Sequence, residues 1–183
     1  MRKITAIELR KILKEHIRWR DTDWKEGEKA DLSHADLGGA DLSRAILHNA
    51  YLSGADLRGA DLRGANLRDA YLEDANLEGA LLRDADLSYA YLYRADLRGA
   101  DLYRADLSHA CLWNADLSRA NLSGACLYDA YLTQVKNLSI NQLSEVKTLY
   151  EAKLDPELIE QVKDEYPRLL EEPEYYEEEE DEE

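Results

Sequence analysis

Residues 55–64 read Ala55-Asp56-Leu57-Arg58-Gly59-Ala60-Asp61-Leu62-Arg63-Gly64, and the five-residue pattern within them decides the fold. Ala recurs at every fifth position from Ala30 to Ala130, and Leu from Leu32 to Leu132, with 21 of each and no exception. Ala and Leu lie two residues apart, so they point to the same side of an extended strand. A helix would rotate successive Leu side chains by about 140° and spread them around its axis. We therefore expect each unit to form a very short strand followed by a corner.

The outward-facing residues give the size of one coil. The residue before Leu is Tyr at positions whose separations are all multiples of 20, namely Tyr51, Tyr71, Tyr91 and Tyr131. Twenty residues are four units, so we expect an all-β solenoid with four-sided coils. Residues 30–134 would supply about five coils, stacked about 4.8 Å apart as strands are in a sheet.

The second corner position is occupied by Gly in seven of the 21 units. Glycine permits the positive φ that many tight turns need. Larger residues stand in the same position in other units, and at those corners we expect a different turn type. These residues are Arg44, Tyr89, Arg94, Arg104 and Arg119.

Both ends of a solenoid expose unpaired backbone groups, so we expect α-helical caps at residues 1–29 and 135–170. Thr5 to Glu8 forms a capping-box pattern that opens the first helix. We expect this helix to place one set of residues near one side, namely Ile7, Leu9, Ile12, Leu13, His16 and Ile17. Trp19 and Trp24 are expected over the first coil.

At the other end, Ser139 to Gln142 forms a second capping-box pattern. It predicts a helix that contains Leu143, Val146, Leu149 and Tyr150. Asp155 and Pro156 fit the N-cap and first position of a last helix, which ends near Pro167.

The net charge of −16 arises from 23 Lys and Arg against 39 Asp and Glu. Residues 171–183 contain ten acids and no base, so we expect a disordered tail that either aids solubility or docks on a basic partner. The acidic balance disfavours direct nucleic-acid binding. No apolar run approaches the length of a membrane span, and the start of the chain is charged. We expect a cytoplasmic protein without membrane association.

The sequence presents no catalytic, cofactor-binding or metal-binding cluster. His34, His48 and His109 fall on different sides of the expected coil, and His16 lies in the cap. Cys111 and Cys126 also fall on different sides, which predicts two free thiols. A column of carboxylates could suggest a cation ladder, but we expect these side chains to bond nearby backbone or Arg58 and Arg98. The column contains Asp36, Asp56, Asp96 and Asp116, with Asn76 between them.

One patch on the last coils is a candidate partner-binding site. It consists of Tyr91, Tyr93, Arg94, Trp113 and Tyr131. Exposed aromatic residues beside Arg are typical of interface hot spots. The alternative is that the aromatic column stacks on itself and shields the coil edges.

The A-(D/N)-L-x-x unit resembles the pentapeptide repeat family over residues 30–134. The resemblance implies a right-handed quadrilateral β-helix with Leu and Ala inside. Leu9 to Trp19 resembles the N-terminal helix of many bacterial members, and Val146 to Pro167 resembles a C-terminal helical segment of a subset. The unbroken regularity of the repeat also fits an idealised sequence.

These features predict a structural or protein–protein interaction module that is not an enzyme, has no cofactor and has an unknown protein partner. We expect a monomer, with a dimer through the C-terminal helices as the alternative. Some relatives inhibit type II topoisomerases such as DNA gyrase by mimicking DNA, and this is the alternative function. The present chain departs from them because its central residues are all Leu, no loop interrupts the repeat, and nine Arg offset sixteen acids in the rod.

Overall fold

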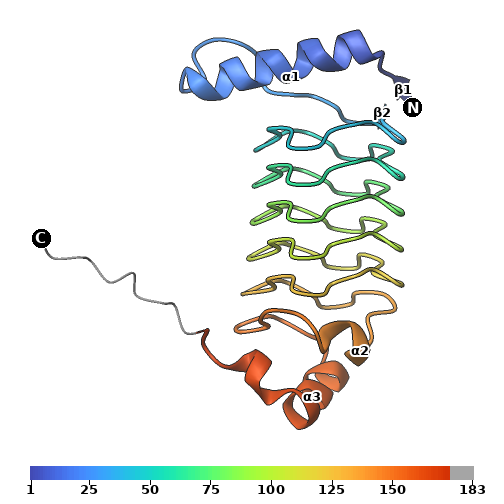
Figure 1. Cartoon of the computed structure of the whole chain (residues 1–183), viewed down its shortest axis with the longest axis vertical. Helices are drawn as coiled ribbons and strands as arrows, with labels where there is room; N and C mark the ends of the chain where they lie inside the picture. The colour runs from blue at the N-terminus through green and yellow to red at the C-terminus, as the bar shows by residue number, and fades with distance from the viewer. Residues whose placement is uncertain (174–183) are drawn as a thin grey trace, which may run out of the picture.

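The computed structural model describes residues 1–173, and they form a stack of short parallel pairings (Figure 1). Each outward residue pairs with the residue 20 positions further on, as in Tyr51↔Tyr71 and Asp56↔Asn76. Four such columns of bridges run along the stack, so one coil contains 20 residues. Regular strands are only two residues long: β1 (Arg2–Lys3) and β2 (Ala35–Asp36). The tail predicted at residues 171–183 lies, from residue 174 onward, outside the described residues.

The interior consists of the Leu and Ala positions of the repeat. All 21 repeat Leu side chains are at most 3% exposed, and nearly all repeat Ala residues are buried with them. Ala40 and Ala45, in the first coil, are only partly buried. Burying one Leu contributes about 1.5–3 kcal/mol. The inward orientation that the sequence predicts for Ala and Leu is therefore observed along the whole repeat.

The corners differ from the expectation, because the residue at the second corner position has a left-handed backbone conformation in all 21 units. φ is 56° at Arg44 and 60° at Tyr89, against 62° at Gly59. Two backbone bonds set this geometry whatever the side chain. At Tyr89 they are the bond from its N–H to the Ser108 carbonyl, 2.9 Å, and the turn bond from Ala90 N–H to the Leu87 carbonyl, 3.0 Å. The expected second turn type is therefore wrong, because these bonds outweigh a left-handed strain of about 1–2 kcal/mol.

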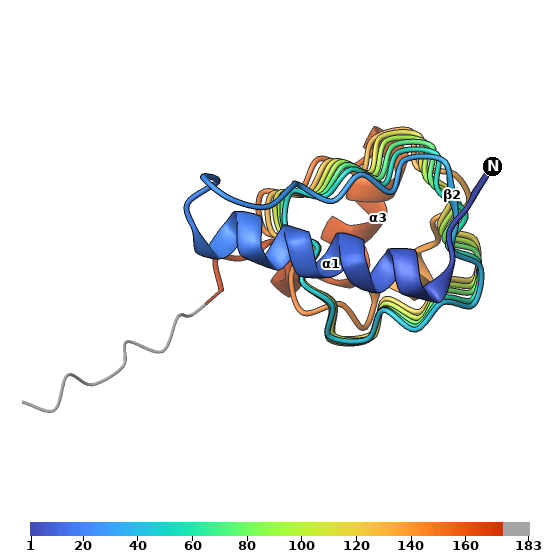
Figure 2. The same ribbon diagram turned by 90° about the horizontal axis from the view of Figure 1, so that it is seen from above.

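The helix α1 (Ala6–Asp21) crosses the N-terminal end of the stack (Figure 2). It begins at the predicted capping box of Thr5 and Glu8. Leu9, Ile12 and Leu13 pack against the core. The preceding strand β1 pairs in parallel with β2 and so adds one more layer to the first coil.

Two residues of α1 contradict the expected apolar side. Ile7 is 80% exposed and Ile17 is 37% exposed. Leu9, Ile12, Leu13 and His16 follow the i, i+3, i+4, i+7 spacing of a single helical face. Ile7 precedes Leu9 by two residues, which places it about 160° away around the helix. Ile7 therefore points away from the core although it is as hydrophobic as Ile12.

At the other end the structure contains α2 (Ile140–Leu143), α3 (Pro156–Glu165) and the 3₁₀ helix η1 (Pro167–Leu170). The capping box at Ser139 and the N-cap at Asp155 lie where the sequence placed them. The helix expected to continue to Tyr150 instead ends at Leu143.

The residues after α2 return to the stack. Thr148 pairs with Cys126, and Lys153 pairs with Tyr131. The N–H of Leu132 donates to the Lys153 carbonyl over 2.8 Å. Without this segment, the backbone groups of the last repeat coil would lack partners. Pairing with the coil therefore outweighs the local helical pattern. No helix among residues 1–173 is long and apolar enough to span a membrane.

Candidate partner-binding surface

The first element of the surface is a ladder of tyrosine rings. Tyr51 and Tyr71 lie with ring centroids 5.2 Å apart, and Tyr71 and Tyr91 lie 5.0 Å apart with planes only 8° from parallel. The ammonium of Lys29 lies 3.9 Å from the centre of the Tyr51 ring. Burial raises the pKa of the Tyr71 hydroxyl, with the neighbouring Tyr91 and Tyr51 adding to the effect, so this ring stays neutral. Tyr91 remains 45% exposed.

A second stack lies at the corner that follows this ladder. Tyr93 and Trp113 stack with centroids 4.9 Å apart and planes 4° from parallel. The guanidinium of Arg94 lies 4.4 Å from the centre of the Tyr93 ring. Its Nε also donates to Asp74 over 2.7 Å, and this contact raises the pKa of Arg94. Arg94 is thus fixed over the aromatic stack as a permanent cation.

A third stack lies at the corner that precedes the ladder, and the sequence analysis did not identify it. Tyr89 stacks on His109 with centroids 4.4 Å apart, and Tyr128 meets the edge of His109 at 5.0 Å. Tyr128 also stacks on Tyr150 at 6.0 Å, and the Arg68 guanidinium lies 4.6 Å from the Tyr89 ring. Tyr89 and His109 lie 20 residues apart at the same corner position, but Tyr128 occupies the other corner position and Tyr150 lies 22 residues after Tyr128, so the 20-residue spacing reveals only the first pair.

We call these three stacks together the aromatic face. It contains four of the five residues predicted for the patch, and Tyr131 belongs to the same column of bridges as Tyr91, with Cys111 between them. In the chain, Tyr89, Tyr91 and Tyr93 alternate with the buried Ala90 and Leu92. Its exposed members Tyr51, Tyr89 and Tyr91 have 41%, 40% and 45% of their surface accessible. The rings therefore stack on one another and still present their outer edges to solvent.

The carboxylate column forms local contacts instead of a metal site. The Nε of Arg58 donates to Asp56 over 2.8 Å, and the Nε of Arg98 donates to Asp96 over 2.7 Å. These hydrogen bonds lower the pKa of both carboxyls. No group of side chains among the described residues has the arrangement of a metal site. Lys3 and Lys136 extend the same column at its two ends.

The histidines and cysteines do not form a catalytic group among the described residues. His16, on the inner side of α1, is fully buried, and its Nδ1 accepts a hydrogen bond from the Ala30 N–H at 3.1 Å. His109 contacts Asp129 at 3.1 Å and belongs to the aromatic face. Cys111 and Cys126 are both free thiols and belong to different columns of bridges.

Several solved structures are similar to this chain. QnrB1, described as a plasmid-mediated fluoroquinolone resistance protein, is 23% identical over 76% of this chain and 75% of its own, with a TM-score of 0.42. HetL, from the cyanobacterium Nostoc and involved in the regulation of heterocyst differentiation, is 34% identical over 67% of this chain and 73% of its own, with a TM-score of 0.23. A pentapeptide repeat protein of the Arabidopsis thaliana thylakoid lumen is 31% identical over 61% and 70%, with a TM-score of 0.27.

A search among curated proteins gives no match. The profile of pentapeptide repeats matches residues 28–64, 65–102 and 100–136 with eight copies, which is more than half of the chain. The matched residues are those whose Ala and Leu fill the core and whose outward positions form the four columns of bridges. The chain belongs to the pentapeptide repeat family.

Proposed function

We propose that this protein is a non-enzymatic interaction module that binds a protein partner through the aromatic face. The observation that carries this proposal is the exposure of Tyr51, Tyr89 and Tyr91, each at least 40% accessible. Stacking alone would require only that the rings contact one another. Rings that also present their edges to solvent, in a continuous surface, are typical of contact sites.

The chemistry of the face favours a partner with apolar and acidic groups. Two guanidinium groups, those of Arg68 and Arg94, lie over tyrosine rings. The Nε edge of Arg94 is occupied by Asp74, so its Nη1 group is the one that can donate to a carboxylate of the partner while the ring covers its plane. Tyrosine hydroxyls along the ladder add hydrogen-bonding groups at little cost in side-chain entropy.

The scaffold beneath the face supports this role. We propose that the stack is the right-handed quadrilateral β-helix of about five repeat coils, closed at its ends by α1 and by the segment from α2 to η1. Every ring of the face is attached to a backbone that is hydrogen-bonded to the coils before and after it. Such a surface loses little freedom on binding. We place the protein in the cytoplasm, in line with its few cysteines.

The ion pairs of the rod weigh against a DNA-like surface as the alternative function. Arginines neutralise acids on several sides of the stack, as in Arg63 with Asp61, Arg98 with Asp96 and Arg104 with Asp84. A DNA mimic needs rows of uncompensated negative charge. Gyrase supercoiling that continues unchanged at micromolar protein is therefore the expected result.

The test is a double substitution, Tyr93→Ala with Trp113→Ala, in a quantitative pull-down from a bacterial lysate. Tyr103→Ala is the matched control, because Tyr103 is also exposed beside an arginine, Arg83, but lies at a different corner. We expect a partner that the wild type and the control retain to be lost by the double variant. The three proteins should have similar melting temperatures, so that the loss is not due to unfolding. Equal retention by all three proteins would refute the assignment of the face.

A further inference from the structure

We propose that the outer side of α1 binds the acidic segment of residues 171–183 from a second copy of this chain. The contact joins the N-terminal end of one solenoid to the C-terminal end of another. It involves a different surface from the aromatic face, so its test does not depend on the proposed function. The argument rests on unpaired cations, on exposed apolar side chains between them, and on the length of chain needed to reach them.

The outer side of α1 carries cations that lack counter-ions. Arg10 and Lys14 are exposed, and neither of them forms an ion pair with any residue in the described part of the chain. By contrast, the two later arginines of the helix are paired, Arg18 with Glu26 and Arg20 with Asp21. The remaining cations form a positive surface at one end of a protein whose net charge is −16.

Apolar side chains lie on the same side of the helix. Ile7, Arg10, Lys14 and Ile17 follow the i, i+3, i+7, i+10 spacing, which is one helical face. Ile7 is 80% exposed, Ile17 is 37% exposed, and Trp24, just after the helix, is 69% exposed. Bulky apolar residues interleaved with unpaired cations indicate a surface that is covered by a partner.

The chain itself contains a segment of complementary chemistry. Residues 171–183 read EEPEYYEEEEDEE, with ten acids, no base and two adjacent tyrosines. The carboxylates match the cations of α1, and Tyr175 and Tyr176 match Ile7, Ile17 and Trp24. Opposite charges across an interface select the partner and accelerate encounter, while the apolar contacts supply affinity.

The segment of the same chain is too short to reach this surface. From the first coil at Asp31 to the last paired residue of that column, Lys153, there are six bridge steps, or about 29 Å. The Leu169 carbonyl, which accepts from the Leu149 N–H, lies one step further, and α1 lies about 8–10 Å above the first coil. The path is therefore about 43 Å even to the helix axis.

Thirteen fully extended residues span at most about 43–47 Å. In the same molecule, residues 171–183 would thus be stretched straight and would reach the helix only with their last residues, leaving none to cover its outer side. A second copy has no such restriction. The interface is heterologous, so it permits linear chains of molecules. This differs from the monomer expected from the sequence, because the outward position of Ile7 and Ile17 is known only from the structure.

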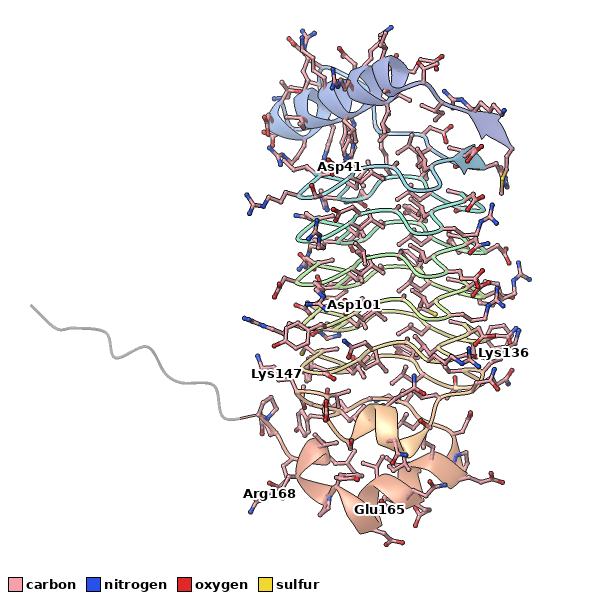
Figure 3. All side chains as sticks on the ribbon, turned by 45° about the vertical axis from the view of Figure 1, so that its right-hand side comes forward. Asp41, Asp101, Lys136, Lys147, Glu165 and Arg168 are labelled. Carbon is pink, nitrogen blue, oxygen red and sulfur yellow. The ribbon has the colours of Figure 1, made fainter. Side chains whose placement is uncertain are left out.

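The experiment measures the molar mass of the full-length protein by sedimentation velocity across a concentration series. We expect mass to rise with concentration at 0.1 M salt and to fall to the monomer at 1 M salt, where the Debye length drops from about 10 Å to about 3 Å. Arg10→Glu with Lys14→Glu should raise the dissociation constant by about tenfold or more, since like charges then face each other. Lys136→Glu with Lys147→Glu is the matched control, with the same change in charge at sites remote from α1 (Figure 3).

A mixing test separates this interface from a general effect of charge. The tail variant replaces Glu177, Glu178, Glu179 and Glu180 with Gln, and it retains the basic helix. The helix variant retains the acidic segment. Each variant alone should be monomeric, and a mixture of the two should give a one-to-one dimer and nothing larger. A wild-type protein that stays monomeric at 0.1 M salt, a mixture without dimer, or a control as weakened as the helix variant would overturn the proposal.

Discussion

Acidification should destabilise the N-terminal cap through His16. This side chain is fully buried and stacks on Trp19 with ring centroids 5.4 Å apart. Its Nδ1 accepts from the Ala30 N–H, so the neutral ring carries its proton on Nε2. Protonation would place a second proton on Nδ1, directed at the Ala30 N–H, and would charge a fully buried ring.

The pKa of His16 gives the size of the effect. Burial lowers this pKa from 6.5 to about 4, and the positive charges of Lys29 and Arg20 act in the same direction. The folded state therefore binds the proton more weakly than the unfolded state does. The contribution to stability is complete above pH 6.5, falls as the pH drops toward 4, and is then constant. The full loss is about 3 kcal/mol, and between pH 7 and pH 5 it is about 2 kcal/mol.

The assay is urea unfolding at a series of pH values, followed by tryptophan fluorescence, because Trp19 contacts His16 directly. His16→Asn keeps an acceptor for the Ala30 N–H and cannot titrate, so its stability should be lower at pH 7 but nearly flat between pH 7 and pH 5. His34→Asn is the matched control: His34 is exposed, and its φ of 55° suits Asn. Identical pH dependence of the wild type and His16→Asn would refute the reasoning.

Four further substitutions test the fold by chemical unfolding. Leu82→Ala removes a fully buried side chain in the middle of the stack and should cost about 2–5 kcal/mol. Gly59→Ala should cost about 1 kcal/mol, because φ is 62° but the added methyl meets no atom within 4 Å. Gly54→Ala should cost more, since its methyl would lie 2.4 Å from the His34 ring, and His34→Ala should reduce that cost to the Gly59 level. Thr5→Ala removes the capping box of α1 and should cost about 1 kcal/mol; an unchanged midpoint would contradict the assigned cap.

Much of the candidate surface follows from the 20-residue spacing. A column of Tyr residues at this spacing must stack, because bridged residues on neighbouring coils lie one strand spacing apart. The pairing of Tyr93 with Trp113 follows from the same rule. The pairing of Tyr89 with His109 follows from it as well. The contacts of Tyr128 with His109 and with Tyr150 do not, because these residues are 19 and 22 positions apart and meet through the length and rotation of their side chains.

The sequence by itself determined the coil. Ala and Leu at fixed positions permit only one inward side, and the spacing of Tyr51, Tyr71 and Tyr91 requires coils of 20 residues. Tertiary structure decided two features that depend on contacts with a neighbouring coil. Residues 144–153 pair with the last repeat coil instead of extending α2, and Tyr89 adopts the same left-handed corner as Gly59. In both cases the backbone of a neighbouring coil offers hydrogen bonds worth more than the local preference, and that neighbour lies about 20 residues away in the chain.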